Sequence, residues 1–223
     1  MDRITQCVDR RNELIGSLAL EGILTLPKGP AGLIIFAHGS GSSRLSPRNS
    51  AVALAMAEAG FATLLFDLLT EREALDKRNV FDIPLLGARV VEAVDWACEE
   101  HSLRLLPLGL FGASTGAAAA LVAAAARPAQ IAAVVSRGGR PDLAARHLAN
   151  VRAPTLLIVG GRDDVVIELN ESAYQELGCE KRIHIIAGAT HLFEEAGALE
   201  EVVEEATAWF ATHLIGAQKA GTQ

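Results

Sequence analysis

Short apolar runs alternate along the chain with segments that contain turn residues and helix-like patterns. Six runs rich in Leu, Ile and Val are typical of strands that are buried on both faces of a parallel sheet. They are Gly32–Ala37, Ala62–Phe66, Pro107–Phe111, Ile131–Val135, Thr155–Val159 and Ile183–Ile186. In the segment Ser17–Leu26 polar residues interrupt the apolar ones, and we expect a half-exposed antiparallel strand there.

Apolar residues at helical spacing predict three helices. Asp82 and Pro84 suit the cap and first turn of one helix, whose apolar face is formed by Leu86, Val90, Ala93, Val94 and Ala97. A second stripe near the end of the chain consists of Leu199, Val202, Val203, Ala206 and Phe210. The segment 114–126 is apolar on every side, which indicates a buried helix that ends before Arg127-Pro128.

Repeated strand–helix units predict an α/β fold in which helices cover both faces of a mostly parallel sheet. No linker, repeat or low-complexity tract divides the sequence, so we expect residues 1–223 to form a single domain that ends in a tail, GAQKAGTQ. Only nineteen residues separate the run that ends at Val135 from the run that begins at Thr155. That length leaves no room for a cap domain over the sheet.

The stretch Leu105–Ala126 carries no charge and is long enough to suggest a membrane span. Proline and glycine residues interrupt its first half, and alanine, which is only weakly hydrophobic, dominates its second half. We therefore expect a buried strand, a turn and a helix, and no membrane partner.

The sequence Gly112-Ala113-Ser114-Thr115-Gly116 lies between the strand and the helix predicted in that stretch. A G-x-S-x-G sequence at a strand-to-helix turn is typical of a nucleophile elbow, because glycines allow the sharp turn and the bend exposes the serine oxygen. We predict that Ser114 is a nucleophile. The alternative is a turn of small residues without chemistry.

A serine hydroxyl needs a base, and the base needs an acid that fixes its orientation. Among six histidines, His191 lies in a turn directly after the last predicted strand, at the sheet edge where Ser114 emerges. Asp163 follows the preceding strand at the same edge, and its neighbour Asp164 is the competing candidate. The chain order Ser114, Asp163, His191 is the order of α/β-hydrolases.

Two backbone amides are candidates for an oxyanion hole. Thr115 follows the nucleophile and begins a helix, and Ser40 lies in the Gly- and Ser-rich loop 38–43 after the first buried strand. We expect His38, the first residue of this oxyanion loop, to shape it rather than to act as a base. A phosphate-binding loop is the rival interpretation, but the sequence has no G-x-x-x-x-G-K-[ST] pattern.

The composition argues against several other classes of protein. The net charge of −7 argues against nucleic-acid binding, which requires a positive face. The three cysteines are widely spaced, so neither a disulfide framework nor a zinc site is expected. The charged N-terminal sequence lacks the apolar run of a signal peptide, and together with the cysteine spacing it favours the cytoplasm.

The motifs FAHGSG, GASTG, GGRD and GATH together resemble the α/β-hydrolase superfamily and, within it, the dienelactone hydrolase-like group. The resemblance extends from about Ser17 to Leu214. It implies hydrolysis of a small carboxylic ester, lactone or thioester through an acyl-enzyme, with no metal and no organic cofactor, and it places catalysis on Ser114, Asp163 and His191. Dienelactone hydrolases use cysteine as the nucleophile, so the group name does not identify the substrate. A non-hydrolytic binding protein, a peptidase and a perhydrolase are the alternatives.

Arginine is frequent near the candidate site for an acidic protein. Arg44 and Arg48 follow the oxyanion loop, and Arg137 and Arg140 follow the strand after the nucleophile. Because a guanidinium group binds carboxylates and phosphates in a bidentate manner, a substrate with an anionic group is one hypothesis. The other is that these arginines pair with carboxylates such as Asp67 and hold loops in place.

Overall fold

The structure, a computed structural model, describes residues 8–215. The predicted tail and the first seven residues lie outside this range. Eight strands form one sheet in the spatial order β1-β2-β4-β3-β5-β6-β7-β8. Their bounds are β1 Asp9–Ile15, β2 Leu20–Leu26, β3 Leu33–Ala37, β4 Ala62–Phe66, β5 Leu108–Ala113, β6 Ile131–Arg137, β7 Thr155–Gly160 and β8 Lys181–Ile186.

The strands from β3 to β8 run parallel, and each contains one of the six apolar runs. β3 to β7 are buried as expected, but the expectation of a buried strand is wrong for β8, because β8 lies at the edge of the sheet and leaves Ile185 41% exposed. β2 is antiparallel to both β1 and β4, and it is the strand expected within Ser17–Leu26. The sequence pattern does not predict β1, because this edge strand is mostly polar and only Ile15 is fully buried. Its pairing with β2 depends on backbone hydrogen bonds, which leave no apolar signature.

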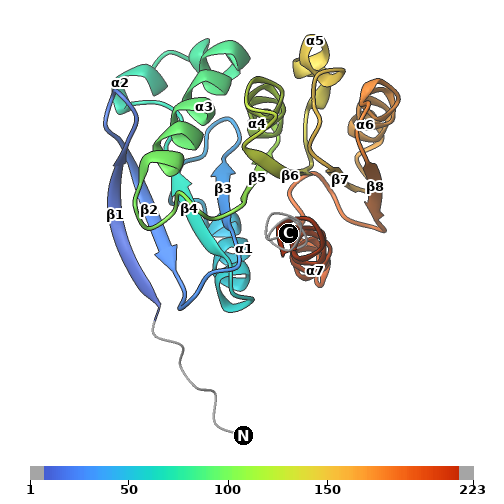
Figure 1. Ribbon diagram of the computed structural model, residues 1–223. Helices are drawn as coiled ribbons and strands as arrows, with labels where there is room; N and C mark the ends of the chain where they lie inside the picture. Colours follow the sequence, from blue (N-terminus) through green and yellow to red (C-terminus); the bar gives the residue numbers. More distant parts are fainter. Residues whose placement is uncertain (1–7, 216–223) are drawn as a thin grey trace, which may run out of the picture.

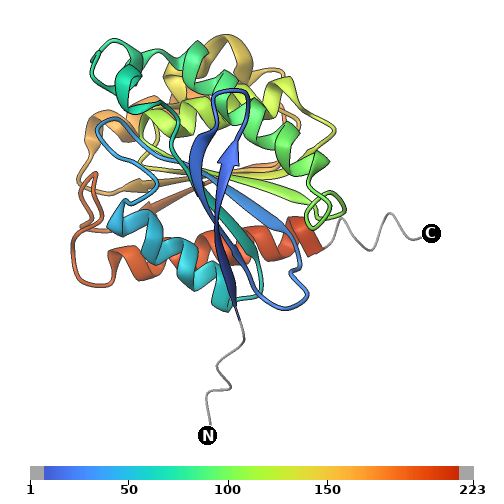
Figure 2. The same cartoon turned by 90° about the vertical axis from the view of Figure 1, so that its left-hand side faces the viewer.

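Helices cover both faces of the sheet. In Figure 1, α2 to α6 lie on one face and α1 and α7 on the other. Figure 2 shows these two layers from the side of β1, with the strands of the sheet twisting behind it. The bounds are α1 Pro47–Glu58, α2 Glu71–Ala74, α3 Ile83–Glu99, α4 Thr115–Ala126, α5 Ala145–Leu148, α6 Asp164–Glu176 and α7 Ala198–Phe210, with 3₁₀ turns at Asn79–Phe81 and Pro141–Ala144 and a π-helical turn at Ala211–Ile215.

The three helices expected from apolar spacing are α3, α4 and α7. Asp82 caps α3 by accepting a hydrogen bond from the amide of Leu85 at 3.0 Å, and Pro84 lies in its first turn. α4 packs against α3 and β5 and is buried along almost its whole length, which explains why its sequence shows no polar face. No helix within residues 8–215 is long and apolar enough to span a membrane.

The connection between β6 and β7 holds only a 3₁₀ turn and the short helix α5. The predicted fold class, a mostly parallel sheet with helices on both faces and no cap domain, is thus confirmed. Because β3 to β8 are parallel, their carboxyl ends share one edge of the sheet, and ligands of such sheets bind outside that edge. The loops after β3, β5, β7 and β8, which carry the candidate site residues, all begin there.

Candidate active site

Ser114 occupies the turn between β5 and α4 in a strained backbone conformation. Its φ and ψ angles are 51° and −121°, and such conformations cost about 1–3 kcal/mol unless the surrounding structure enforces them. Two glycines allow this turn. A Cβ on Gly116 would overlap backbone oxygens at the end of β3, and a Cβ on Gly112 would overlap the backbone of Ala117. The G-x-S-x-G sequence therefore forms a tight strand-to-helix turn with the serine at its corner.

The loops after β7 and β8 bring His191 and Asp163 together. Nδ1 of His191 lies 2.7 Å from Oδ2 of Asp163. A proton on Nδ1 donates to the carboxylate, which leaves Nε2 as the basic nitrogen. Asp164, the competing acid, is the first residue of α6, and no hydrogen bond joins it to His191 in the described part of the chain.

The loop that carries His191 is tied to its surroundings by two backbone amides. Thr190 donates its amide hydrogen to Oε2 of Glu195 at 3.1 Å, and this bond is the main reason why the pKa of Glu195 is lowered. Arg162 donates its amide hydrogen to the carbonyl of Ala189 at 2.9 Å. The imidazole and its carboxylate are therefore held by two linked loops. The sequence does not predict this role of Glu195, because nothing in the local pattern marks it as a loop anchor.

Ser114 and His191 line the same cavity, which has a volume of about 270 Å³. The other walls of this nucleophile cavity come from the oxyanion loop, the start of α1 and the end of β6. Among the described residues no hydrogen bond joins the Ser114 hydroxyl to His191, and catalytic hydrogen bonds are often long in unliganded sites and tighten when substrate binds. The Ser114 hydroxyl and the His191 imidazole thus come from two loops to one cavity, and a third loop brings the Asp163 carboxylate to the imidazole.

The two predicted oxyanion amides are available beside the elbow. Within residues 8–215 the amides of Ser40 and Thr115 donate to no backbone acceptor. Thr115 is the first residue of α4, and Ser40 lines the nucleophile cavity. The oxyanion loop packs directly on the elbow, because a Cβ on Gly39 would lie 3.1 Å from the Cβ of Ser114.

His38 anchors the oxyanion loop to the segment after β4. Its Nε2 accepts a hydrogen bond from the amide of Leu68 at 3.1 Å, and its Nδ1 donates to the carbonyl of Gly39 at 3.0 Å. Burial lowers the pKa of His38, although the Gly39 carbonyl and the charge of Asp67 act in the opposite direction. The neutral ring is the form that makes both bonds, so His38 shapes the loop.

Two of the four candidate arginines are fully engaged by carboxylates. Arg44 forms ion pairs with Asp67 and Glu21. Arg140 donates two hydrogen bonds of 2.8 Å to Asp142, which raise the pKa of Arg140. Both arginines therefore hold loops in place, as the second hypothesis for these residues expects.

The other two candidate arginines line the nucleophile cavity. Arg48 forms an ion pair of 2.8 Å with Glu194. Arg137 is buried, and its guanidinium group forms no ion pair with any residue of the described range. Burial and, to a smaller extent, the charge of Arg48 lower the pKa of Arg137 to about 10, so it stays charged at neutral pH.

A larger cavity, of about 610 Å³, also borders the oxyanion loop. Gly39, Ser40 and Ser42 line both cavities, and Thr115 lines the larger one. Its apolar wall consists of Leu20, Leu68, Leu69, Val80 and Leu86. The sequence does not predict this cavity, because its walls come from β2, the segment after β4 and α3, and no local pattern connects them.

No group of three or more His, Cys, Asp or Glu side chains among residues 8–215 is arranged to hold a metal ion. Cys98 and Cys179 are free thiols that line neither cavity. Burial is the main cause that raises the pKa of the Cys98 thiol.

Comparison with known proteins places these features in a family. The profile of the α/β hydrolase domain family matches residues 30–215. A crystal structure of dienelactone hydrolase from Anabaena variabilis has a TM-score of 0.89 and 52% sequence identity, over 94% of this chain and 99% of that chain. Est1E from Butyrivibrio proteoclasticus has a TM-score of 0.77 over 92% of this chain and 98% of that chain. At 17% identity this second likeness shows the fold alone.

Two Mycobacterium tuberculosis proteins are also similar, and both are named provisionally as phosphoribosyl transferases. Each is 53% identical over 206 residues, which make up 92% of this chain but 46% of the relative. The chain thus spans less than half the length of these relatives. The family profile, the 52% identity to a dienelactone hydrolase and the eight-stranded sheet agree on one conclusion. The chain belongs to the α/β hydrolase family and is similar to dienelactone hydrolases.

Proposed function

We propose that the chain is a serine hydrolase that cleaves a small carboxylic ester, lactone or thioester through an acyl-enzyme on Ser114. The observation that carries this proposal is the hydrogen bond of 2.7 Å between His191 and Asp163, at the wall of a cavity that Ser114 also lines. A serine alone is a weak nucleophile, and an imidazole oriented by a carboxylate is the arrangement that activates it.

In the first half of the reaction, Nε2 of His191 takes the proton of the Ser114 hydroxyl while the serine oxygen attacks the carbonyl carbon of the substrate. The carbonyl oxygen becomes negatively charged and accepts hydrogen bonds from the amides of Ser40 and Thr115. The tetrahedral intermediate then breaks its bond to the alcohol or thiol, which leaves with the proton held by His191. Asp163 stabilises the imidazolium throughout.

In the second half, His191 removes a proton from water, and the resulting hydroxide attacks the acyl carbon. Collapse of the second tetrahedral intermediate releases the carboxylic acid and returns the proton to Ser114. Each oxyanion donor typically contributes about 100-fold or more to turnover. The free amides of Ser40 and Thr115 supply this contribution without any side-chain charge.

The shape of the site supports a small substrate. The larger cavity, with an apolar wall and a volume of about 610 Å³, meets the nucleophile cavity at Gly39, Ser40 and Ser42. Since both cavities share the oxyanion loop, we assign the apolar part of the substrate to the larger cavity and the scissile carbonyl to the junction. A compact aryl or short-chain ester has the size for this arrangement.

The name of the Mycobacterium tuberculosis relatives does not change this assignment. The segment they share with this chain matches the hydrolase domain, and it makes up 46% of each relative. We assign hydrolysis to the shared part.

The experiment that tests the proposal combines covalent labelling with ester turnover. A fluorophosphonate probe should label the wild type once per chain, and Ser114→Ala should abolish both labelling and the hydrolysis of para-nitrophenyl butyrate. Ser102→Ala is the matched control, because Ser102 is exposed and its side chain bonds only to Glu100 in the part of the chain that the structure describes. Labelling that persists in Ser114→Ala would refute the assignment. Labelling without ester turnover would instead direct the search to peptides or to perhydrolysis.

A further inference from the structure

Arg137 is the last residue of β6, and its side chain lies inside the fold. The residue is only 8% exposed, and its Nη1 is buried without a hydrogen-bond partner within the described range. Arg89 shows the usual arrangement, since its side chain is 11% exposed and forms ion pairs with Glu73 and Glu92 at 3.0 and 3.2 Å. Buried charges in proteins are normally paired in this way. Arg137 therefore lacks a partner that its position requires.

Two further features of the nucleophile cavity favour a negative charge. Arg48 is the second residue of α1, lines the same cavity and lowers the pKa of Arg137. The first turn of α1 carries no acidic residue, so the positive end of the dipole of this 12-residue helix is not neutralised. Both features place positive potential in the cavity that Arg137 lines.

The chain's own carboxylates near the cavity are engaged elsewhere. Asp163 bonds His191, and Glu194, whose side chain is 63% exposed, pairs with Arg48 at the rim. Neither forms an ion pair with Arg137. Because Ser114 lines the same cavity, a molecule that places a negative group against Arg137 also places its remainder beside the nucleophile.

We propose that Arg137, together with Arg48 and the N-terminus of α1, binds one oxyanion group of the substrate. The protein then acts on esters or thioesters whose other end carries a single negative charge, an inference that rests on the proposed hydrolase function. A guanidinium group matches such an oxyanion by donating two parallel hydrogen bonds. A single charge fits because Glu194 already compensates Arg48, and among residues 8–215 Arg137 is then the one arginine of the cavity without an ion pair.

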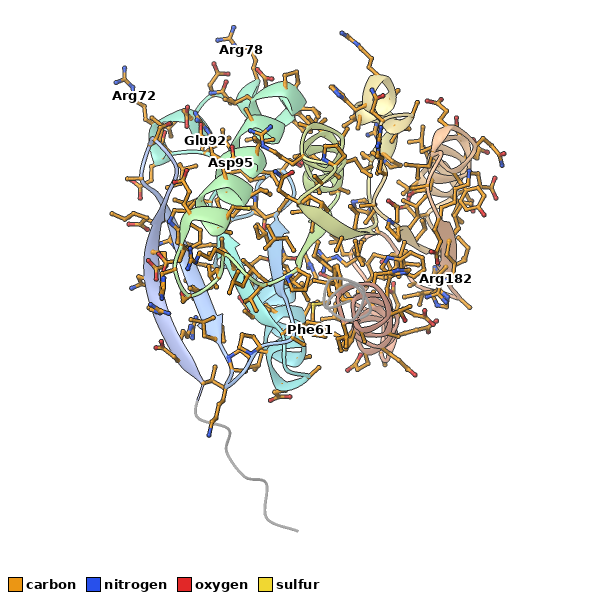
Figure 3. The ribbon with its side chains drawn as sticks, in the orientation of Figure 1. Phe61, Arg72, Arg78, Glu92, Asp95 and Arg182 are labelled. Carbon is orange, nitrogen blue, oxygen red and sulfur yellow. The ribbon has the colours of Figure 1, made fainter. Side chains whose placement is uncertain are left out.

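The test compares two esters that differ only in charge, para-nitrophenyl hydrogen glutarate and its neutral methyl ester. We expect kcat/KM to be about 10- to 100-fold higher for the charged ester, the ratio that hydrogen bonds to a charged group typically provide. Arg137→Met should reduce this ratio to near one, and Arg48→Met should reduce it in part. Arg78→Met is the matched control, because Arg78 is exposed, points away from the molecule (Figure 3), and should keep the wild-type ratio.

A binding measurement keeps the test independent of turnover. Monomethyl glutarate should raise the Tm of the wild type and not that of Arg137→Met, with Arg137→Gln as a second variant in case the first does not fold. A Tm shift without hydrolysis of either ester would refute the hydrolase proposal and support the subsite. Hydrolysis of both esters at equal kcat/KM, or a preference that survives in Arg137→Met, would overturn the subsite alone. An ester of matched length with a phosphonate in place of the carboxylate tests whether the bound group is a carboxylate or a phosphate-type group. A kcat/KM ratio of charged to neutral ester that is higher for the phosphonate than for the carboxylate would identify a phosphate-type group.

Discussion

Replacing Arg137 by methionine should stabilise the protein while it weakens binding of an anionic ester. Burial lowers the pKa of Arg137 to about 10, a change that corresponds to a penalty of roughly 3 kcal/mol on its charged form. The guanidinium carbon lies 5.9 Å from the ring centroid of Phe111, and a cation–π contact returns about 0.5–1 kcal/mol. Methionine has a similar length and flexibility and buries no charge. We therefore expect a net stabilisation of about 1–3 kcal/mol.

Urea unfolding followed by circular dichroism measures this effect, and a thermal scan should show a Tm higher by about 2–4 °C for each kcal/mol in a protein of this size. Arg89→Met is the matched control, because its guanidinium group is similarly buried but paired with Glu73 and Glu92. That variant should lose about 1–3 kcal/mol, since its carboxylates remain without their partner. If Arg137→Met is destabilised by as much as Arg89→Met, then Arg137 has a partner in the folded protein and the reasoning fails.

Three further predictions concern the elbow, the acid and the oxyanion loop. Asp163→Asn should lower kcat about 10³- to 10⁴-fold, whereas Asp164→Asn should keep a kcat near that of the wild type. Equal activity of the two variants in steady-state assays would contradict the choice of Asp163 as the acid. Gly116→Ala should lower the free energy of unfolding by more than about 3 kcal/mol, because the added Cβ overlaps the carbonyl oxygen of Ala37. An unchanged midpoint of urea unfolding would contradict the close approach of Gly116 to β3. The pKa of His38 lies below its usual 6.5 in the folded protein, so the unfolded chain takes up the proton first as pH falls through 6.5, and stability is lost on acidification. Between about pH 7 and about pH 5 the free energy of unfolding should therefore fall less for His38→Gln than for the wild type. An equal fall for the two proteins would show that His38 is not the group involved.

The sequence predicts the centre of the fold and the places of the candidate catalytic residues because both depend on local patterns. The runs that form β3 to β7 are apolar on both faces, as strands covered by two helical layers must be. The elbow can be recognised in the sequence because its turn requires glycine at positions 112 and 116, where a Cβ would overlap neighbouring backbone atoms. Asp163 and His191 could be paired in advance, since residues that follow parallel strands meet at one edge of a sheet.

The remaining features depend on contacts between distant segments, which leave no pattern in the sequence. Nothing local distinguishes Arg137 from Arg140, yet Arg140 pairs with a carboxylate two residues away and Arg137 has no partner in the described range. The edge strand β1 is polar and is held by its backbone pairing with β2. The apolar wall of the larger cavity combines residues of β2, the segment after β4 and α3, which only the folded chain brings together.

The account depends most directly on the formation of an acyl group on Ser114 during turnover. Rapid quenching of the reaction with para-nitrophenyl acetate, followed by mass spectrometry of proteolytic peptides, measures this intermediate. The account predicts a burst of one nitrophenol per chain and an acetyl group on the peptide that contains Ser114, with neither in Ser114→Ala. Turnover without an acyl group on that peptide, or an acyl group on any other residue, would contradict it.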